Sequence, residues 1–307
     1  MLPYFFYNYL NINMMKLLKL KPSVGLLSIP YSLIFIFFFF IPLILTFIIS
    51  FWDYNEYSII PDFIFENYSY IFKDCLNFEK DMCVTFKTYL STFIFCFITW
   101  FFTLIIGFFV AYFLAFYVNS ITWQIVLFLL CTIPFWTSNV IRMISWIPLL
   151  GRNGLVNDFL LSTGLADAPQ EWLLYSGFSI VLAFVHLYTL FMIVPIFNSM
   201  MRIDKSIIEA AYDNGANGLQ ILWNVIIPLC KPGIVIGSIF VITVVMGDFI
   251  TIGIMGGQQI PSIGKIIYVE MSYLQLPAAA ANAVILLALT LLIIWIMTKM
   301  IDIRKEL

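Results

Sequence analysis

Six runs of apolar residues, each long enough to cross a lipid bilayer, constrain the fold of this chain more than any other feature. The runs cover residues 22–51, 88–118, 123–150, 176–201, 233–254 and 278–300. About 20 mostly apolar residues span the hydrocarbon core as a helix, the form in which the backbone satisfies its own hydrogen bonds. Hydrophobic residues make up 63% of the 307 residues, against roughly 45–50% in average soluble proteins. The sequence therefore predicts an all-α integral membrane protein with six transmembrane helices.

The distribution of basic residues predicts which helix ends face the cytoplasm. With six helices, the two termini, the 119–120 turn and the connector after the fourth run share one side of the membrane. That side carries nine basic residues: Lys16, Lys19, Lys21, Arg202, Lys205, Lys231, Lys299, Arg304 and Lys305. The other side carries five: Lys73, Lys80, Lys87, Arg152 and Lys265. Because cytoplasmic loops are enriched in Lys and Arg, we expect both termini in the cytoplasm and the protein in the inner (plasma) membrane.

One polar stretch, residues 208–234, interrupts the apolar pattern between the fourth and fifth runs. Four residues at helical spacing predict a short helix with a small-residue face: Ile207, Ala210, Ala211 and Asn214. Gly215 suits the end of that helix. Pro232-Gly233 suits the first turn of the next membrane helix, where proline is tolerated. We therefore expect a polar loop that contains one short helix.

This stretch resembles the cytoplasmic coupling loop of the permease subunits of binding-protein-dependent ABC importers. The family signature is Glu-Ala-Ala, three residues, Gly, nine residues, Ile, one residue and Leu-Pro. Here Glu209-Ala210-Ala211 and Gly215 match. Val225 and Ile227 replace the family's Ile and Leu before Pro228. The resemblance implies that a partner ATPase docks on the loop through these residues: Glu209, Ala210, Ala211, Asp213, Gly215, Ala216 and Pro228.

The same resemblance implies how the chain is divided. The expected parts are a cytoplasmic tail 1–21, a first peripheral transmembrane helix 22–51, an extracytoplasmic loop 52–83, the ABC transporter type-1 permease domain 84–300 and a cytoplasmic tail 301–307. The Met14-Met15 pair followed by basic residues also reads like a natural start, with residues 1–13 as an upstream extension.

Two regions are similar to spermidine/putrescine permeases in particular. The first is the third-helix region, with Pro134 to Arg142, Trp146, Leu149-Leu150-Gly151 and Gly154 to Asn157. The second is the fifth-helix region, with Gly247-Asp248-Phe249, Met255-Gly256-Gly257 and Ile263-Gly264. The 119–120 turn departs from the pattern, because it lacks the basic residues expected there. This resemblance implies a permease that moves polyamines into the cytoplasm by alternating access.

Asp248 is the one acidic residue that we place inside a core helix. An ionised side chain at the centre of a bilayer costs about 2.5–3.5 kcal/mol, so such residues usually face a cavity. A polyamine needs carboxylates for its ammonium groups and favours aromatic faces through cation–π contact. The predicted substrate pathway contains Asp248, Trp136, Asn139 and Arg142, and further compatible side chains are Glu171, Glu270, Trp146 and Trp172.

These assignments leave alternatives open. Asp248 is equally compatible with a helix-pairing acid that binds no ligand. Tryptophan at the ends of membrane helices is ordinary for the aromatic belt at the interface. Arg142 argues against a bare cation pore, and it either pairs with an acid or holds a gate.

The sequence contains no pattern for catalysis, metal binding or nucleotide binding. It lacks metal-ligand spacing, a Ser/His/Asp or Cys/His set and a phosphate-cradling glycine loop. Its one histidine, His186, lies in an apolar run and reads as an interior group. We therefore expect no catalytic residue, no metal and no cofactor in this chain. Cys75 and Cys83 share a polar loop, and their spacing alone leaves their pairing open.

The implied partners are a cytoplasmic ABC ATPase dimer that uses the ATP, a second permease subunit and an extracytoplasmic substrate-binding protein, with no nucleic acid. Within the same class, the alternatives are permeases for iron, an oxyanion or a sugar. From other classes, the alternatives are a secondary transporter driven by an ion gradient and a membrane assembly factor. The secondary transporter often shows internal repeats, and we see none in this sequence.

Overall fold

The computed structural model describes residues 24–55, 58–73, 75 and 83–299, and the chain divides into two compact units, 1–49 and 50–307. The predicted tails, 1–21 and 301–307, lie outside the described residues. In the first unit, α2 (Val24–Phe35) continues through a π-helical turn η1 (Ile36–Phe40) into α3 (Ile41–Ile49). The wide turn ends two residues before Pro42, which lacks the N–H that an α-helix would use. Ser28–Ile49 is long and apolar enough to cross a membrane.

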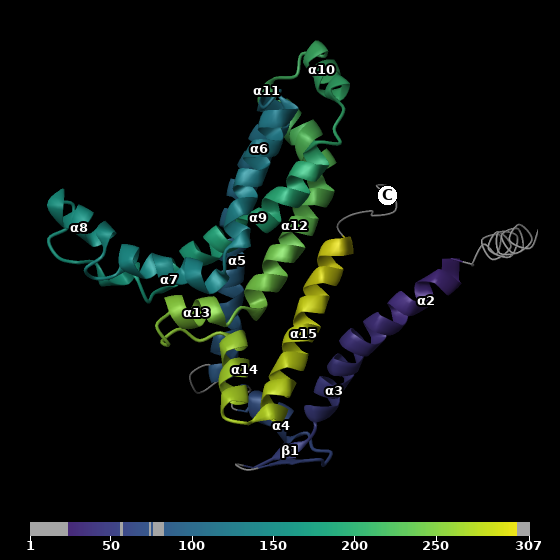
Figure 1. Cartoon of the computed structure of the whole chain (residues 1–307), viewed down its shortest axis with the longest axis vertical. Helices are drawn as coiled ribbons and strands as arrows, with labels where there is room; N and C mark the ends of the chain where they lie inside the picture. The colour runs from purple at the N-terminus through teal and green to yellow at the C-terminus, as the bar shows by residue number, and fades with distance from the viewer. Residues whose placement is uncertain (1–23, 56–57, 74, 76–82, 300–307) are drawn as a thin grey trace, which may run out of the picture. The chain divides into compact units, whose positions relative to one another are not determined.

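The second unit holds the remaining elements (Figure 1). It begins with β1 (Asp53–Tyr54), β2 (Ile59–Ile60), α4 (Glu66–Ile71), α5 (Val84–Tyr112) and the π-helical turn η2 (Phe113–Tyr117). Next come α6 (Ile121–Thr132), the 3₁₀ turn η3 (Ile133–Trp136), α7 (Asn139–Leu150), α8 (Leu155–Ser162), the 3₁₀ turn η4 (Glu171–Leu173) and α9 (Gly177–Met200). The unit ends with α10 (Lys205–Asp213), α11 (Gly218–Ile221), the π-helical turn η5 (Leu222–Ile226), α12 (Ile227–Gly247), α13 (Ile250–Met255), α14 (Ile263–Ser272) and α15 (Leu276–Lys299).

The expectation of an all-α membrane protein is confirmed. Five helices among the described residues are long and apolar enough to cross a membrane, and a bent helix pair makes up to six. The five are Ser28–Ile49, Val84–Tyr117, Glu171–Met200, Gly218–Gly247 and Leu276–Lys299. The pair β1–β2, joined by Asp53↔Ile60 and Tyr54↔Ile59, adds a small antiparallel sheet that the sequence analysis did not predict.

The third predicted span, 123–150, contains Pro134, and the helix is broken beside this proline, as a proline inside a helix leads one to expect. The structure breaks it into Ile121–Trp136 and Asn139–Ser162, which meet at 88°. Pro134 removes a backbone donor and the chain tightens into η3. Thr137 then adopts an extended conformation, with ψ of 151°. The break is therefore a sharp turn between two helices.

The limits predicted for the fifth span, 233–254, are wrong. The helix runs without a break from Gly218 to Gly247, so Pro232 lies inside α12 rather than in its first turn. The π-helical turn η5 ends two residues before Pro228 and accommodates its missing N–H. The chain then breaks after Gly247, and Asp248 lies at that break instead of inside the helix.

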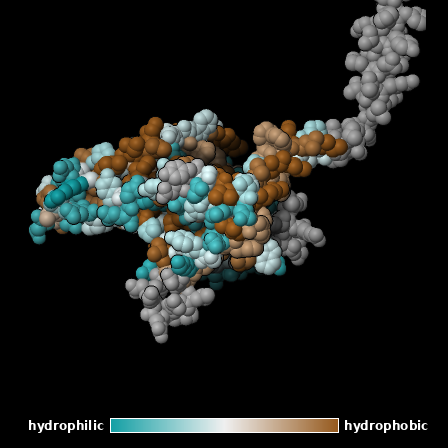
Figure 2. Space-filling view, turned by 90° about the horizontal axis from the view of Figure 1, so that it is seen from below, coloured by the Kyte–Doolittle hydropathy of each residue, from teal (hydrophilic) through white to brown (hydrophobic). Residues whose placement is uncertain are grey.

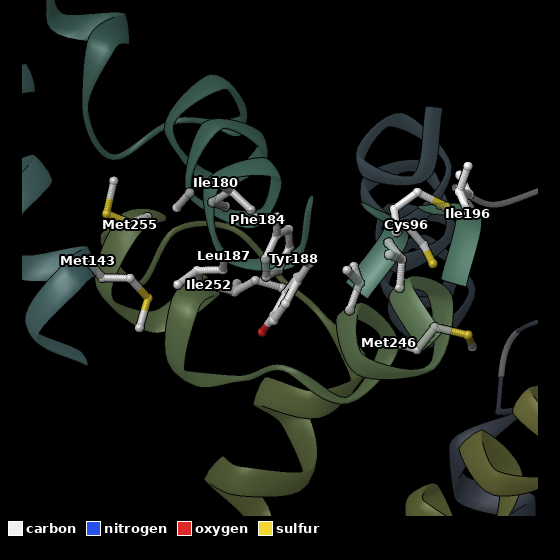
Figure 3. Packing of buried hydrophobic residues seen from close by; sticks show 14 of the residues in the cluster. Cys96, Met143, Ile180, Phe184, Leu187, Tyr188, Ile196, Met246, Ile252 and Met255 are labelled. Atoms are coloured by element: carbon white, nitrogen blue, oxygen red, sulfur yellow. The ribbon is translucent and has the colours of Figure 1, made fainter. Parts of the chain in front are cut away.

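Helices α5, α9 and α12 form the core of the second unit (Figure 1). Buried side chains from all three meet there (Figure 3), among them Cys96, Phe184 and Met246. A Cβ added at Gly233 on α12 would collide with the Pro195 carbonyl oxygen and would lie 2.5 Å from Ser199 Oγ, both on α9. A larger residue would collide there, so this glycine lets the two helices approach closely.

The loops gather at two opposite ends of the second unit. At one end, Gln124 Nε2 at the start of α6 donates to Leu114 O at 2.8 Å and lies 3.1 Å from Met201 Sδ, directly after α9. At the other end, Ser91 Oγ on α5 donates to Pro261 O at 3.0 Å. The 119–120 turn and the polar loop thus share one end, as the six-helix topology requires. Seen from the end that carries β1 and α4, hydrophilic residues gather at the left of the view (Figure 2).

A disulfide between Cys75 and Cys83 settles the question that the spacing left open. Cys83 also caps α5, because its Sγ accepts a hydrogen bond from Phe86 N at 3.3 Å. Nearby, Asn67 Nδ2 on α4 donates to the carbonyls of Ser50 and Trp52 at 3.0 and 2.8 Å. These bonds give the segment before α5 a defined structure where it is described.

Candidate coupling surface and pathway site

The polar loop folds into a short helix with well-defined ends. Asp204 begins α10, and its Oδ1 accepts from Ser206 N at 3.0 Å. Gly215 follows the helix with φ of +82°, a conformation that favours glycine. Two bonds close this end: Gly215 N donates to Tyr212 O at 2.8 Å and Ala216 N to Ala211 O at 3.1 Å. The predicted helix and its predicted end at Gly215 are therefore confirmed.

The two faces of α10 differ from the predicted arrangement. Ile208 and Ala211 pack toward the core, while Ile207 and Ala210 are exposed. Ala211 thus does not share the outer face with Ile207 and Ala210, because its position turns it toward the bundle. The exposed face still carries small and apolar side chains, and α10 lies at the very end of the second unit (Figure 1).

Neighbouring α11 extends the exposed apolar surface. Asn217 and Gln220 cap it reciprocally, each backbone N–H donating to the other's side chain at 2.8 Å. Leu219 is 70% exposed and Trp223 is 66% exposed. Sequence reasoning missed these residues, although the tryptophan within the polar stretch was a usable signal. Capped short helices that present apolar side chains can dock into a groove of another protein.

The remaining predicted coupling residues lie on or near this surface. Glu209, Asp213 and Pro228 are exposed, and Ala216 is half-buried. We call the set formed by α10, α11 and Trp223 the coupling surface. Its role in docking stays a prediction.

Asp248 lies between α12 and α13, and three hydrogen bonds hold its carboxylate. Oδ1 accepts from Thr251 N at 2.9 Å. Oδ2 accepts from the hydroxyls of Tyr188 and Thr251. Tyr188 and Thr251 are buried, whereas Asp248 itself is half-buried. No basic side chain forms an ion pair with Asp248 in the part of the chain that the structure describes.

Asn139 and Arg142 come together on α7, and neither forms a hydrogen bond with Asp248, although Arg142 interacts electrostatically with Tyr188, the partner of Asp248. Arg142 is only 9% exposed, and its Nη2 donates to Asn139 Oδ1, whereas its Nε has no hydrogen-bond partner among the described residues. Trp136, at the end of η3, is 84% exposed. Elements α7 and α13 pack against each other and against α9. The structure therefore brings two of the four predicted pathway residues into contact, and it places Asp248 in the same three-helix region.

Sequence reasoning missed Tyr188, Thr251 and the partner of His186. Trp146 Nε1 donates to His186 Nδ1 at 3.1 Å, and their rings meet edge to face. Tyr188 was hidden because it stands in a run rich in Phe and Leu. Thr251 could have been predicted, because an Asp at the start of a helix commonly accepts a hydrogen bond from the backbone N–H three residues later.

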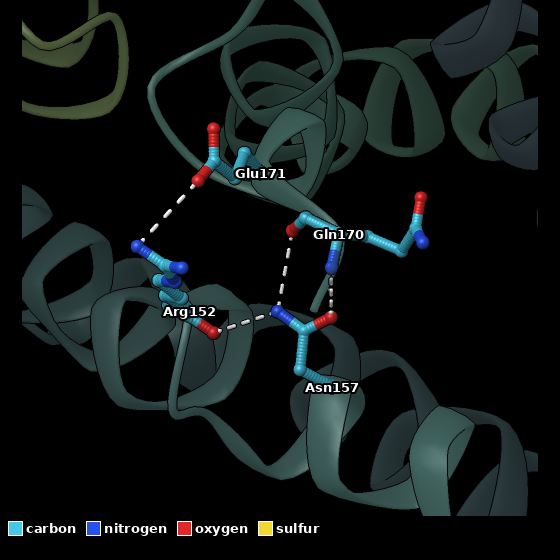
Figure 4. Close-up of polar contacts among 5 residues, drawn as sticks. Arg152, Asn157, Gln170 and Glu171 are labelled. Atoms are coloured by element: carbon cyan, nitrogen blue, oxygen red, sulfur yellow. Dashed lines mark hydrogen bonds and ion pairs between the residues drawn. The ribbon is translucent and has the colours of Figure 1, made fainter. Parts of the chain in front are cut away.

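The other compatible acids have partners of their own. Glu270 on α14 accepts two bonds from Asn282 Nδ2, both at 3.0 Å, and lines a cavity of about 250 Å³. Burial raises the pKa of the Glu270 carboxyl above its usual range, and the Asn282 amide lowers it. Glu171 forms an exposed ion pair with Arg152, at 3.7 Å (Figure 4). Such a surface pair contributes little to stability.

Asn157 fixes the segment between α7 and α9. It is completely buried, and its Nδ2 donates to Gly151 O at 3.0 Å and to Gln170 O at 3.2 Å (Figure 4). Its Oδ1 accepts from Gln170 N at 2.7 Å. The Gly-Leu-Val-Asn motif from the sequence therefore serves this fold as an anchor for a loop. In the described residues, no group of three or more His, Cys, Asp or Glu side chains is placed to hold a metal.

Comparisons with known proteins agree with this architecture. No protein-family model matches the chain. The chain is 34% identical, over 187 residues, to the spermidine/putrescine transport system permease protein PotB of Escherichia coli; the match covers 60% of this chain and 67% of PotB. The PotB of Haemophilus influenzae is 30% identical over 186 residues, which are 59% of this chain and 65% of that protein.

A solved structure shares the fold. It is the crystal structure of a bacterial alginate ABC transporter in complex with an alginate pentasaccharide-bound periplasmic protein. The match has a TM-score of 0.72 at 17% identity and covers 93% of this chain and 96% of that one. At 17% identity this match shows a shared fold only. The family relationship rests on the match to PotB. The chain belongs to the family of ABC transporter permease subunits that includes PotB.

Proposed function

We propose that this permease subunit moves polyamines, such as spermidine and putrescine, into the cytoplasm by alternating access. Relatives at 30–34% identity are named for spermidine and putrescine transport. The observation that carries the substrate class is the carboxylate of Asp248, which is half-buried and bonded to neutral donors. No basic side chain of the described residues forms an ion pair with this carboxylate, so it can attract an ammonium group.

The coupling surface supports the proposal that a separate ATPase supplies the energy for transport. A cytoplasmic ABC ATPase dimer would dock on α10 and α11, whose capped ends hold their exposed apolar side chains in place. Movement of the ATPase would pass through α9, which leads into α10, and through α12, which continues from α11 and η5. In this proposal the coupling surface and both termini lie in the cytoplasm, and the protein lies in the inner membrane.

A second permease subunit and an extracytoplasmic substrate-binding protein complete the proposed complex. The solved alginate transporter was crystallised with a substrate-loaded periplasmic protein. In this chain, the exposed apolar side chains of α6, such as Ile121 and Leu130, offer surface for lipid or for a second subunit. The loops at the end opposite α10 would receive the binding protein.

The test is substrate-stimulated ATP hydrolysis by the complex that co-purifies with this chain. We expect an ATPase subunit to co-purify and its rate to rise with spermidine- or putrescine-loaded binding protein. Stimulation by a sugar, ferric iron or sulfate instead would replace the polyamine assignment. Transport without any associated ATPase would favour the secondary transporter, whereas a different activity that is independent of any ATPase would favour the assembly factor.

A further inference from the structure

The three hydrogen bonds on Asp248 leave one position of its carboxylate open. A carboxylate has about four acceptor positions, two on each oxygen. Oδ2 uses both of its positions, for the hydroxyls of Tyr188 and Thr251. Oδ1 uses one, for Thr251 N at 2.9 Å. A fourth donor can therefore bind only at the second position of Oδ1.

The three donors come from two buried residues. Tyr188 is 4% exposed, and its ring packs against Phe184 and Phe191 with centroids 5.8 and 6.2 Å apart. Its hydroxyl lies at the edge of this apolar cluster (Figure 3). Thr251, fully buried, holds Asp248 through both its hydroxyl and its backbone. Because all these donors are neutral, they orient the carboxylate and leave its net charge unchanged.

We propose that Tyr188 and Thr251 are positioning residues for the substrate: they hold the Asp248 carboxylate so that Oδ1 accepts one N–H from a primary or secondary ammonium group. This inference rests on the proposed transport of polyamines, and it adds how the Asp248 carboxylate is oriented toward the ammonium group of the substrate. Asp248 is half-buried and therefore partly accessible, whereas Tyr188 and Thr251 are buried. Hydrogen bonds to a charged acceptor are strong enough that losing one donor should change the rate of uptake measurably.

The test is polyamine uptake into proteoliposomes that contain the full complex, with its binding protein saturated. Tyr188→Phe removes the hydroxyl and keeps the packed ring, and it should lower the rate of uptake about tenfold. Thr251→Val should lower uptake as well, while Thr251→Ser, which keeps a hydroxyl, should stay close to the parental rate. Tyr89→Phe is the matched control, because the Tyr89 hydroxyl is buried without a hydrogen-bond partner in the described residues.

A double-mutant comparison separates positioning from a general structural role. In an Asp248→Asn background, adding Tyr188→Phe should reduce uptake less than twofold further, since both changes act on one interaction. The proposal would be overturned if the double variant lost uptake by the product of the two single losses, or if Tyr188→Phe alone kept the parental rate. Abundance and thermal melting of the complex should match the parent, and a fall that tracks the loss of uptake would assign Tyr188 to folding. If the parental complex itself takes up no polyamine, the proposed function fails before this inference is reached.

Discussion

Substitutions at Gly215 separate backbone strain from steric bulk at the end of α10. Gly215 has φ of +82°, and an added Cβ would meet nothing within 4 Å. In this chain the penalty therefore comes from the backbone conformation, which costs an L-residue roughly 1–2 kcal/mol. At 1.4 kcal/mol per factor of ten, Gly215→Ala should reduce coupled transport by up to about 5–30-fold. Asn tolerates this conformation better than Ala, so Gly215→Asn should keep more activity although it is larger.

The assay is ATP-driven polyamine uptake by the reconstituted complex, with ATP hydrolysis measured in parallel. Gly215→Trp, which adds bulk to strain, should uncouple hydrolysis from uptake while the protein still inserts in the membrane. Gly164→Ala is the matched control, because Gly164 also has a positive φ, of +72°, with nothing within 4 Å of an added Cβ. It follows α8, away from the coupling surface, and should leave coupling intact.

The order of activities decides whether this reasoning is right. Strain predicts that Asn retains more activity than Ala, and Trp retains least. If Ala is harmless and Asn is harmful, steric contact with a partner controls the site and the strain argument fails. Normal transport by Gly215→Trp would remove the coupling role itself.

Three further outcomes follow from the structure. An impermeant thiol reagent should label Cys75 and Cys83 on intact cells only after reduction, because they are joined in a disulfide; labelling that also requires permeabilised cells would reverse the proposed topology. Asp248→Asn should lower polyamine uptake far more than it lowers protein abundance, because it removes the charge but keeps the size; parental uptake would make Asp248 a structural acid. The raised pKa of Glu270 means that its favourable contribution to stability is present at acid pH and is lost as pH rises through that pKa. Melting curves of the purified protein should show this loss, and Glu270→Gln should flatten it; an unchanged pH profile would show that Glu270 is not responsible.

Long apolar runs made most of the helices predictable, since each run can satisfy its backbone only as a helix within a membrane. The short helix α10 and its end at Gly215 were also predictable, because glycine is favoured where φ is positive. The angle at Pro134 was not, because a proline permits anything from a mild kink to a full break. Tertiary contacts among α7, α9 and α13 decide between these.

The fifth helix shows a different limit. Pro232-Gly233 suggested the first turn of a helix, but with the π-helical turn η5 before it the helix continues through both Pro228 and Pro232. Such a turn has no sequence signature that single residues reveal. Tyr188 was likewise invisible as a partner of Asp248, since 60 positions separate them along the chain. The pairing of Cys75 with Cys83 required the fold as well, because spacing does not determine connectivity.

The most direct test of the central claim is spermidine uptake by proteoliposomes that contain this chain with its co-purified subunits and loaded binding protein. Ion gradients are collapsed, and ATP is supplied on the side of the coupling surface. The account predicts that uptake requires ATP, persists without any ion gradient and falls sharply in Asp248→Asn. Uptake that follows an ion gradient and ignores ATP, or ATP-driven uptake of another solute with none of spermidine or putrescine, would contradict it.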